Sequence, residues 1–106
     1  MTNKAHIAGR VAGVNSGALA NGQPVVTMLV RLASDGGGYG YDLVRVVCYG
    51  KLAEVARARA IDGVGVDVTG RLQSRWVQPD DHRGWSVVEV VASGLHFGPP
   101  RAEGGA

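Results

Sequence analysis

The chain has 106 residues, with 11 Lys and Arg against 9 Asp and Glu, which gives a net charge of +2. This length suits one domain with a small core, and so weak a positive charge does not by itself indicate a partner. The sequence shows no basic and apolar leader, no long apolar run and a single cysteine, which predicts a reducing, cytoplasmic location without membrane or disulfide.

The first third of the chain predicts two strands joined by a polar loop. Residues 6–14 alternate weakly and are rich in glycine and alanine, which favours a curved first strand. Residues 15–22 hold two glycines, two asparagines and a serine, a composition typical of loops. Residues 25–33 predict a strong second strand, whose apolar face consists of Val26, Met28, Val30 and Leu32.

Residues 34–40, SDGGGYG, predict a hairpin connection that is longer than a tight two-residue turn. Three consecutive glycines could suggest a phosphate cradle. No Lys-Ser/Thr pair follows them and no helix begins there, which argues against a nucleotide-binding loop. We therefore interpret this segment as a finger that presents Tyr39 and Tyr41.

Residues 44–60 change abruptly from a strand pattern to a helix pattern. Val44, Val46 and Cys48 alternate with Arg45, Val47 and Tyr49, which is the period of a strand. Gly50 breaks this alternation, and residues 51–60 are helix formers that Asp62-Gly63 closes. Cys48 falls on the inward face, so we interpret it as a small buried hydrophobe.

Two further strands and a tail complete the chain. Residues 64–76 predict the fourth strand, in which Gly70 permits a bend and a polar face follows. Residues 77–84 predict a polar hairpin loop, and residues 85–93 a fifth strand that Leu95 and Phe97 can extend. The core face of this fifth strand is predicted to be Val88, Val90 and Ala92. Residues 98–106, GPPRAEGGA, predict a flexible tail outside the domain of residues 1–97.

Several of these segments resemble bacterial single-stranded DNA-binding proteins. Residues 44–56, VRVVCYGKLAEVA, are similar to that family's HRVVLFGKLAEVA run. Residues 68–76, VTGRLQSRW, resemble its EGQLRTRKW, and residues 86–91, SVVEVV, resemble its TTEVVV. The opening MTNKAHIAGRVAG also resembles the start of primosomal replication protein N, a relative of the same fold. The resemblance covers nearly the whole chain and is loose between residues 16 and 41.

The predicted order is β-β-β-α-β-β, in an all-β chain with one short helix. Periodicity alone supports a small barrel or a sandwich. The position of the helix and the resemblance together favour an OB-fold, a five-stranded Greek-key β-barrel.

Binding single strands without sequence preference requires flat side chains for stacking and a basic groove for phosphates. The aromatic candidates are Tyr39, Tyr41, Tyr49, Trp76 and Trp85, and the basic candidates are Arg45, Lys51, Arg71, Arg75 and Arg83. Any of these aromatics could instead serve the core or a subunit interface. For Trp85 the two interpretations are equally supported, whereas the polar surroundings of Trp76 favour function.

The resemblance implies roles for particular aromatics. Tyr49 matches the family's stacking Phe, and Trp76 matches the Trp of its fourth-to-fifth strand hairpin. Leu43 stands where the family has a Trp, and Tyr39 or Tyr41 could substitute for its other stacking Trp.

Signals for an enzyme or a metal site are weak. Asp80, Asp81 and His82 are contiguous, and neighbours in sequence rarely converge on one ion, so a solvated turn is the preferred interpretation. His6 and His96 lack a partner at a metal-binding spacing, and no nucleophile motif is present. We expect no catalysis, no metal and no cofactor.

The expected function is to coat and protect single-stranded DNA in replication, recombination or repair, near the nucleoid. The alternatives are an accessory primosomal protein that acts mainly through protein contacts, and an RNA-binding OB domain. Small size and the resemblance predict a homotetramer, with a dimer second. The family normally ends in an acidic tip that binds partner enzymes, and residues 98–106 contain only Glu103 as an acid, so no recruitment through this segment is expected.

Overall fold

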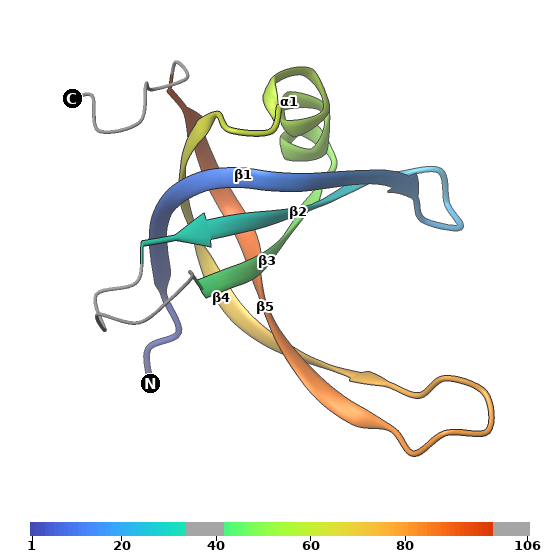
Figure 1. The fold of residues 1–106 in the computed structure, drawn as a ribbon. Helices are drawn as coiled ribbons and strands as arrows, with labels where there is room; N and C mark the ends of the chain where they lie inside the picture. Colours follow the sequence, from blue (N-terminus) through green and yellow to red (C-terminus); the bar gives the residue numbers. More distant parts are fainter. Residues whose placement is uncertain (34–41, 99–106) are drawn as a thin grey trace.

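The computed structural model describes residues 1–33 and 42–98 and shows five strands and one helix (Figure 1). The strands are β1 (Ala5–Ala18), β2 (Pro24–Leu32), β3 (Asp42–Tyr49), β4 (Gly65–Val77) and β5 (Trp85–Phe97), and the helix is α1 (Lys51–Arg59). The predicted order of elements is therefore confirmed. None of the helices in the described part of the chain is long and apolar enough to cross a membrane.

The five strands close into a barrel in the order β1-β2-β3-β5-β4. The strand β1 pairs antiparallel with both β2 and β4, which is possible because it is 14 residues long and curves around the barrel. The strands β3 and β5 meet in parallel, at Val46 with Val90 and Val47 with Val91. This is the OB-fold arrangement that the element order predicts.

A close backbone contact at Gly70 allows β4 to bend around the barrel. The register of β4 against β5 shifts between Thr69 and Gly70, which marks a bulge. A Cβ atom at Gly70 would collide with the carbonyl oxygen of Val91, so only glycine fits there. The bend predicted at this glycine is present.

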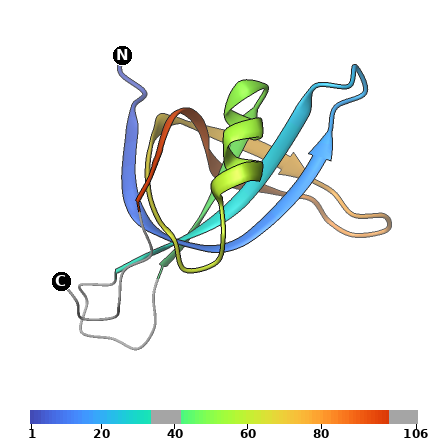
Figure 2. The same ribbon diagram turned by 90° about the horizontal axis from the view of Figure 1, so that it is seen from above.

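The core fills the barrel with aliphatic side chains from every strand. Its fully buried members include Val26, Met28, Val30, Val46, Cys48 and Val68. The helix α1 lies across one end of the barrel (Figures 1 and 2), where Ala53 and Ala56 face the core with no exposed surface. These small side chains allow the helix to approach closely, and the predicted burial of Cys48 is confirmed.

The helix ends earlier than expected. It stops at Arg59, and Ala60 already has extended dihedral angles. Gly63 has the predicted positive φ, 90°, but in the turn after the helix, where its N–H donates to the carbonyl oxygen of Val11. The glycine therefore shapes the connection to β4 rather than the last turn of α1.

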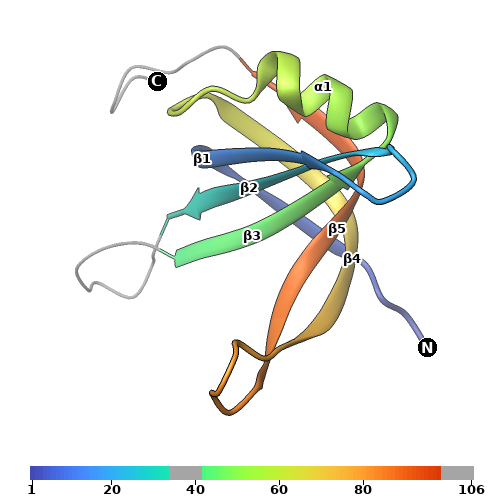
Figure 3. The same cartoon turned by 90° about the vertical axis from the view of Figure 1, so that its right-hand side faces the viewer.

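Two hairpins extend beyond the barrel, and both correct an expectation. Residues 15–18, predicted as loop, continue β1 because they pair with residues 24–27 of β2. Residues 74–88 form a second projecting hairpin, which we call the arm (Figure 3). Val88, predicted to lie in the core, is 63% exposed because it pairs with Ser74 on this arm, outside the barrel.

Candidate nucleic-acid interface

The outward side chains of β2 and β3 form one surface of the barrel. Strand alternation buries Val30 and Val46 in the core and leaves their neighbours Leu29, Arg31 and Arg45 exposed. The register places Leu29 opposite Arg45 and Arg31 opposite Leu43. Tyr49 ends the same face of β3, with a side chain that is 36% exposed.

The strands β5 and β4 continue this surface. The parallel pairing of Val47 with Val91 brings Glu89, two residues earlier on β5, beside Arg45. Antiparallel pairs then place Gln73 opposite Glu89 and Arg75 opposite Val87. We call the resulting surface the outer sheet face; it comprises Leu29, Arg31, Leu43, Arg45, Tyr49, Arg71, Gln73, Arg75, Trp85, Val87 and Glu89.

An ion-pair cluster occupies the middle of the outer sheet face. Arg45 Nε lies 3.2 Å from Glu89 Oε2, and Arg75 Nε lies 3.4 Å from Glu89 Oε1. Gln73 Nε2 also donates a hydrogen bond of 3.3 Å to Glu89 Oε1. The two predicted phosphate ligands Arg45 and Arg75, which lie on different strands, are thus brought together by a carboxylate that sequence reasoning did not single out.

The two tryptophans of the arm lie on opposite faces. Trp85 pairs with Val77 and shares the face of Arg75, whereas Trp76 follows Arg75 directly and pairs with Ser86 on the other face. Trp76 Nε1 donates to Gln78 Oε1 at 3.2 Å, and its indole lies so close to Gly84 that a Cβ there would collide with it. Trp76 and Trp85 are 62% and 48% exposed.

The remaining predicted residues lie at the margins of this surface. Arg71 is exposed on β4, at the barrel end of the outer sheet face, and Lys51 is exposed at the start of α1, two residues after Tyr49. Arg83 is exposed in the loop of the arm. Tyr39 and Tyr41, which were predicted to stack, lie outside the described residues.

A family model described as the single-strand binding protein family matches residues 2–98. The chain belongs to this family. The barrel of this single-strand binding family member is similar to the solved structure "Plasmodium falciparum SSB complex with ssDNA", with a TM-score of 0.79 and 21% sequence identity. The match covers 92% of this chain and 95% of the other, and no curated protein matches.

Two of the histidines weighed as metal ligands, His6 and His82, lie away from the outer sheet face of this single-strand binding family member. Within residues 1–33 and 42–98, no three His, Cys, Asp or Glu side chains gather as metal ligands. His82 Nδ1 lies 2.7 Å from the carbonyl oxygen of Asp80, as expected for a polar turn. His6 Nε2 lies 2.6 Å from Asp67 Oδ1, a half-exposed pair that joins β1 to β4.

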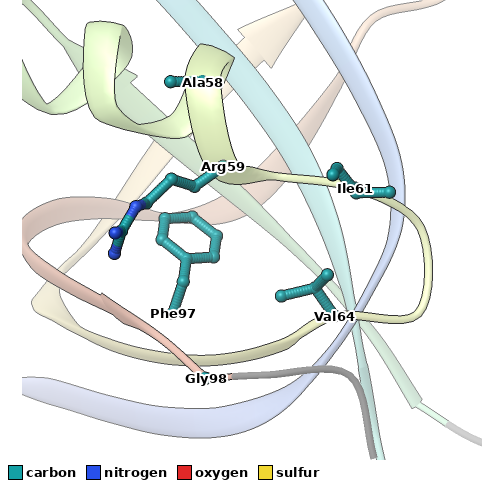
Figure 4. Close-up of a pocket in the computed structure, with 6 residues that line it drawn as sticks. All are labelled: Ala58, Arg59, Ile61, Val64, Phe97 and Gly98. Carbon is teal, nitrogen blue, oxygen red and sulfur yellow. The ribbon is translucent and has the colours of Figure 1, made fainter.

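A hollow beside the end of α1 contains none of the predicted site residues. It lies between the last turn of the helix and the end of β5, where the Arg59 side chain runs alongside the ring of Phe97 (Figure 4). Its other lining residues are Ala58, Ile61, Val64 and Gly98. The hollow offers one aromatic ring and one cation among small and aliphatic residues, whereas a strand-binding surface uses several of each along a groove.

Proposed function

We propose that the chain binds single-stranded DNA along its outer sheet face and thereby coats and protects exposed strands in replication, recombination or repair. The observation that carries this proposal is the gathering of arginines and aromatics on one face of a family member. Arg45, Arg71 and Arg75 share this face with Tyr49 and Trp85. The strand 2–3 face of an OB-fold and the hairpin between its last two strands are where oligonucleotides commonly bind.

Two kinds of contact would provide the affinity. Bases stack on flat side chains for about 1–3 kcal/mol each, whatever the base, and arginines neutralise phosphates and release counterions. Contacts of both kinds carry little sequence information, so binding is largely independent of sequence. Trp76 offers a second stacking surface on the other side of the arm, which a strand that crosses the arm can reach.

The direct test is a titration of the protein with oligo-dT while tryptophan fluorescence is recorded. Trp76→Phe and Trp85→Phe each leave one tryptophan, so the two faces of the arm are observed separately. We expect quenching of Trp85 because it lies on the face of Arg75. Size-exclusion chromatography with excess oligo-dT checks complex formation independently. If neither the Trp85 emission nor the elution volume changes, the protein does not bind single strands on this face.

Salt dependence tests the phosphate contacts. Arg71→Ala should weaken binding equally on dT and dC oligomers and lower the salt slope by about one unit. Arg57→Ala is the matched control, because Arg57 is an exposed arginine on α1, outside the outer sheet face. A loss of affinity with an unchanged slope would show that Arg71 acts in another way.

One observation favours a second function, that of an accessory replication protein acting through protein contacts. Leu43, 48% exposed beside Arg31, offers an aliphatic contact where an aromatic would stack a base. Binding to a replication-restart partner that persists when the outer sheet face is mutated would support this alternative. A preference for oligo-U over oligo-dT would support the RNA-binding alternative, since only RNA offers the 2′-hydroxyl.

A further inference from the structure

Glu89 is a buried charge on a surface that otherwise carries positive charge. Its residue is only 3% exposed, although it lies on the outer sheet face and not in the barrel core. Burying a carboxylate is costly unless cations and hydrogen bonds compensate it. Here Arg45 and Arg75 supply the cations and Gln73 supplies a hydrogen bond. Such a cluster needs an explanation, because a negative charge in a strand-binding surface repels phosphates.

We propose that Glu89 is a positioning residue, which holds Arg45 and Arg75 in the conformations that bind the phosphates of a single strand. This inference rests on the proposed function. The structure assigns Glu89 no contact with the strand itself. Its effect on binding passes entirely through the two arginines.

The geometry of the contacts is suited to this role. Arg45 of β3 lies against Oε2 and Arg75 of β4 against Oε1, so one side chain contacts cations from two strands. Within the described residues the buried Oε2 has no hydrogen-bond partner, so the ion pair with Arg45 is the contact that compensates its charge. Both contacts are made by Nε, the guanidinium nitrogen nearest the backbone. The arginine side chains keep 46% and 44% of their surface exposed, so phosphates can still reach them. The cluster holds two positive charges and one negative, and remains attractive to DNA.

Two consequences for binding follow. Arginine loses considerable side-chain entropy when it is immobilised, and arginines that are already held lose less when they meet a phosphate. Glu89 also ties β3 to the base of the arm, so the arm and the barrel present their cations in one fixed arrangement. Both effects strengthen binding, whereas the carboxylate's own charge weakens it.

These opposing effects allow a test that depends on the sign of the change. Glu89→Gln removes the charge and keeps the shape. If Glu89 acted only as a negative charge, its loss would tighten binding to oligo-dT and steepen the salt dependence. If it positions the arginines, affinity should fall roughly fivefold or more, within the usual coupling of contacting residues. Glu54→Gln, the same change at an exposed site on α1, is the matched control and should leave affinity nearly unchanged.

A double-mutant cycle separates positioning from a general loss of structure. In a variant that carries Arg45→Ala and Arg75→Ala, Glu89→Gln should no longer weaken binding, because no arginines remain for it to hold. A variant that merely disturbed the fold would weaken binding in both backgrounds. Circular dichroism and thermal unfolding of each variant show that the barrel is retained.

If Glu89→Gln fails to fold, the same titration is made with Glu89→Asp. Glu89→Asp keeps the charge and shortens the reach, so a fall in affinity for oligo-dT cannot be due to charge. The inference is overturned if a folded Glu89→Gln or Glu89→Asp protein binds oligo-dT as tightly as the original chain. If the original chain itself does not bind oligo-dT, the proposed function fails instead, and the two failures are thus distinguishable.

Discussion

At the scale of single residues, the buried Cys48 thiol makes stability depend on alkaline pH. Burial raises the pKa of this thiol from 9.0 to about 11, because the thiolate is poorly solvated inside the barrel. In the unfolded chain the thiol ionises near its ordinary pKa. Between pH 9 and 11 the unfolded state therefore loses a proton that the folded state keeps, and stability falls as the pH rises.

The measurement is the denaturation midpoint as a function of pH, for the original chain and for Cys48→Ala. All other ionisable groups are the same in both proteins, so the difference between the two isolates Cys48. We expect the original chain to lose its stability advantage as the pH rises through this window. A difference that stays constant with pH would contradict a buried, neutral thiol.

We expect Tyr49 to stack on a base of a bound strand. Its ring ends the outer sheet face of β3, and stacking on a base requires only a flat π surface. Tyr49→Ala should weaken oligo-dT binding by about 1–3 kcal/mol, whereas Tyr49→Phe, which keeps the ring, should bind like the original chain. Fluorescence titration of both variants measures this. Equal losses in the two would assign the effect to the hydroxyl and not to stacking.

Among the strands and hairpins, the arm is where one side chain rests directly on a glycine: the Trp76 indole lies against Gly84. A methyl group at residue 84 would collide with the indole, and the indole is exposed enough to swing into solvent instead. We expect Gly84→Ala to move the Trp76 indole into solvent, which breaks its hydrogen bond to Gln78 and shifts its emission to longer wavelength. The variant is made together with Trp85→Phe, so that Trp76 is the tryptophan observed. The unfolding temperature should change little, because the arm lies outside the core.

The control for this variant is Gly17→Ala in the same Trp85→Phe background. Gly17 lies in the β1–β2 hairpin, and a Cβ there would meet nothing within 4 Å. We expect its emission spectrum to match the parent's. An unchanged spectrum in Gly84→Ala would mean that Trp76 does not rest on Gly84 in solution.

The elements could be predicted from sequence because their signals are local. Alternation in residues 44–49 and the break at Gly50 define a strand and a helix without any knowledge of the barrel. The end of β1 could not be found in this way, since residues 15–18 are loop-like in composition and become a strand only by pairing with β2. Val88 was misplaced because the point where the arm leaves the barrel depends on the path of the other strands.

The candidate site was predictable in its residue types but not in its arrangement. The arginines and aromatics were identified from composition and resemblance. That Arg75 and Trp76 lie on opposite faces follows from alternation and could have been inferred. The burial of Glu89 could not, because it requires arginines from two other strands to meet at one carboxylate. The signal available was a lone acid within the apolar run SVVEVV.

At the scale of the whole molecule, we expect a homotetramer, with a dimer as the second possibility. Unpaired strand edges favour association, but in the closed barrel each strand has two neighbours, so exposed apolar surface is the stronger reason here. Leu19, Ile61, Leu72 and Val88 are exposed at 42–64%, well spread over the described chain. Sedimentation equilibrium measures the mass directly, and a monomer at micromolar concentration would contradict the prediction.

The closure of the barrel also has a consequence for how the chain folds. The strands β1, β2 and β3 are neighbours in sequence and can form a meander as soon as they are synthesised. Closure must wait for β4 and for β5, which lies between β3 and β4 in the barrel. The return of β4 to the start of the chain is seen at Leu72, whose carbonyl oxygen accepts from Asn3 Nδ2 and whose N–H donates to Asn3 Oδ1, across 69 residues of chain. Contacts so distant in sequence form slowly, because the intervening loop must first lose its freedom. Until β5 is available to complete the barrel, the meander exposes apolar surface, and this interval is when the chain most needs protection from aggregation.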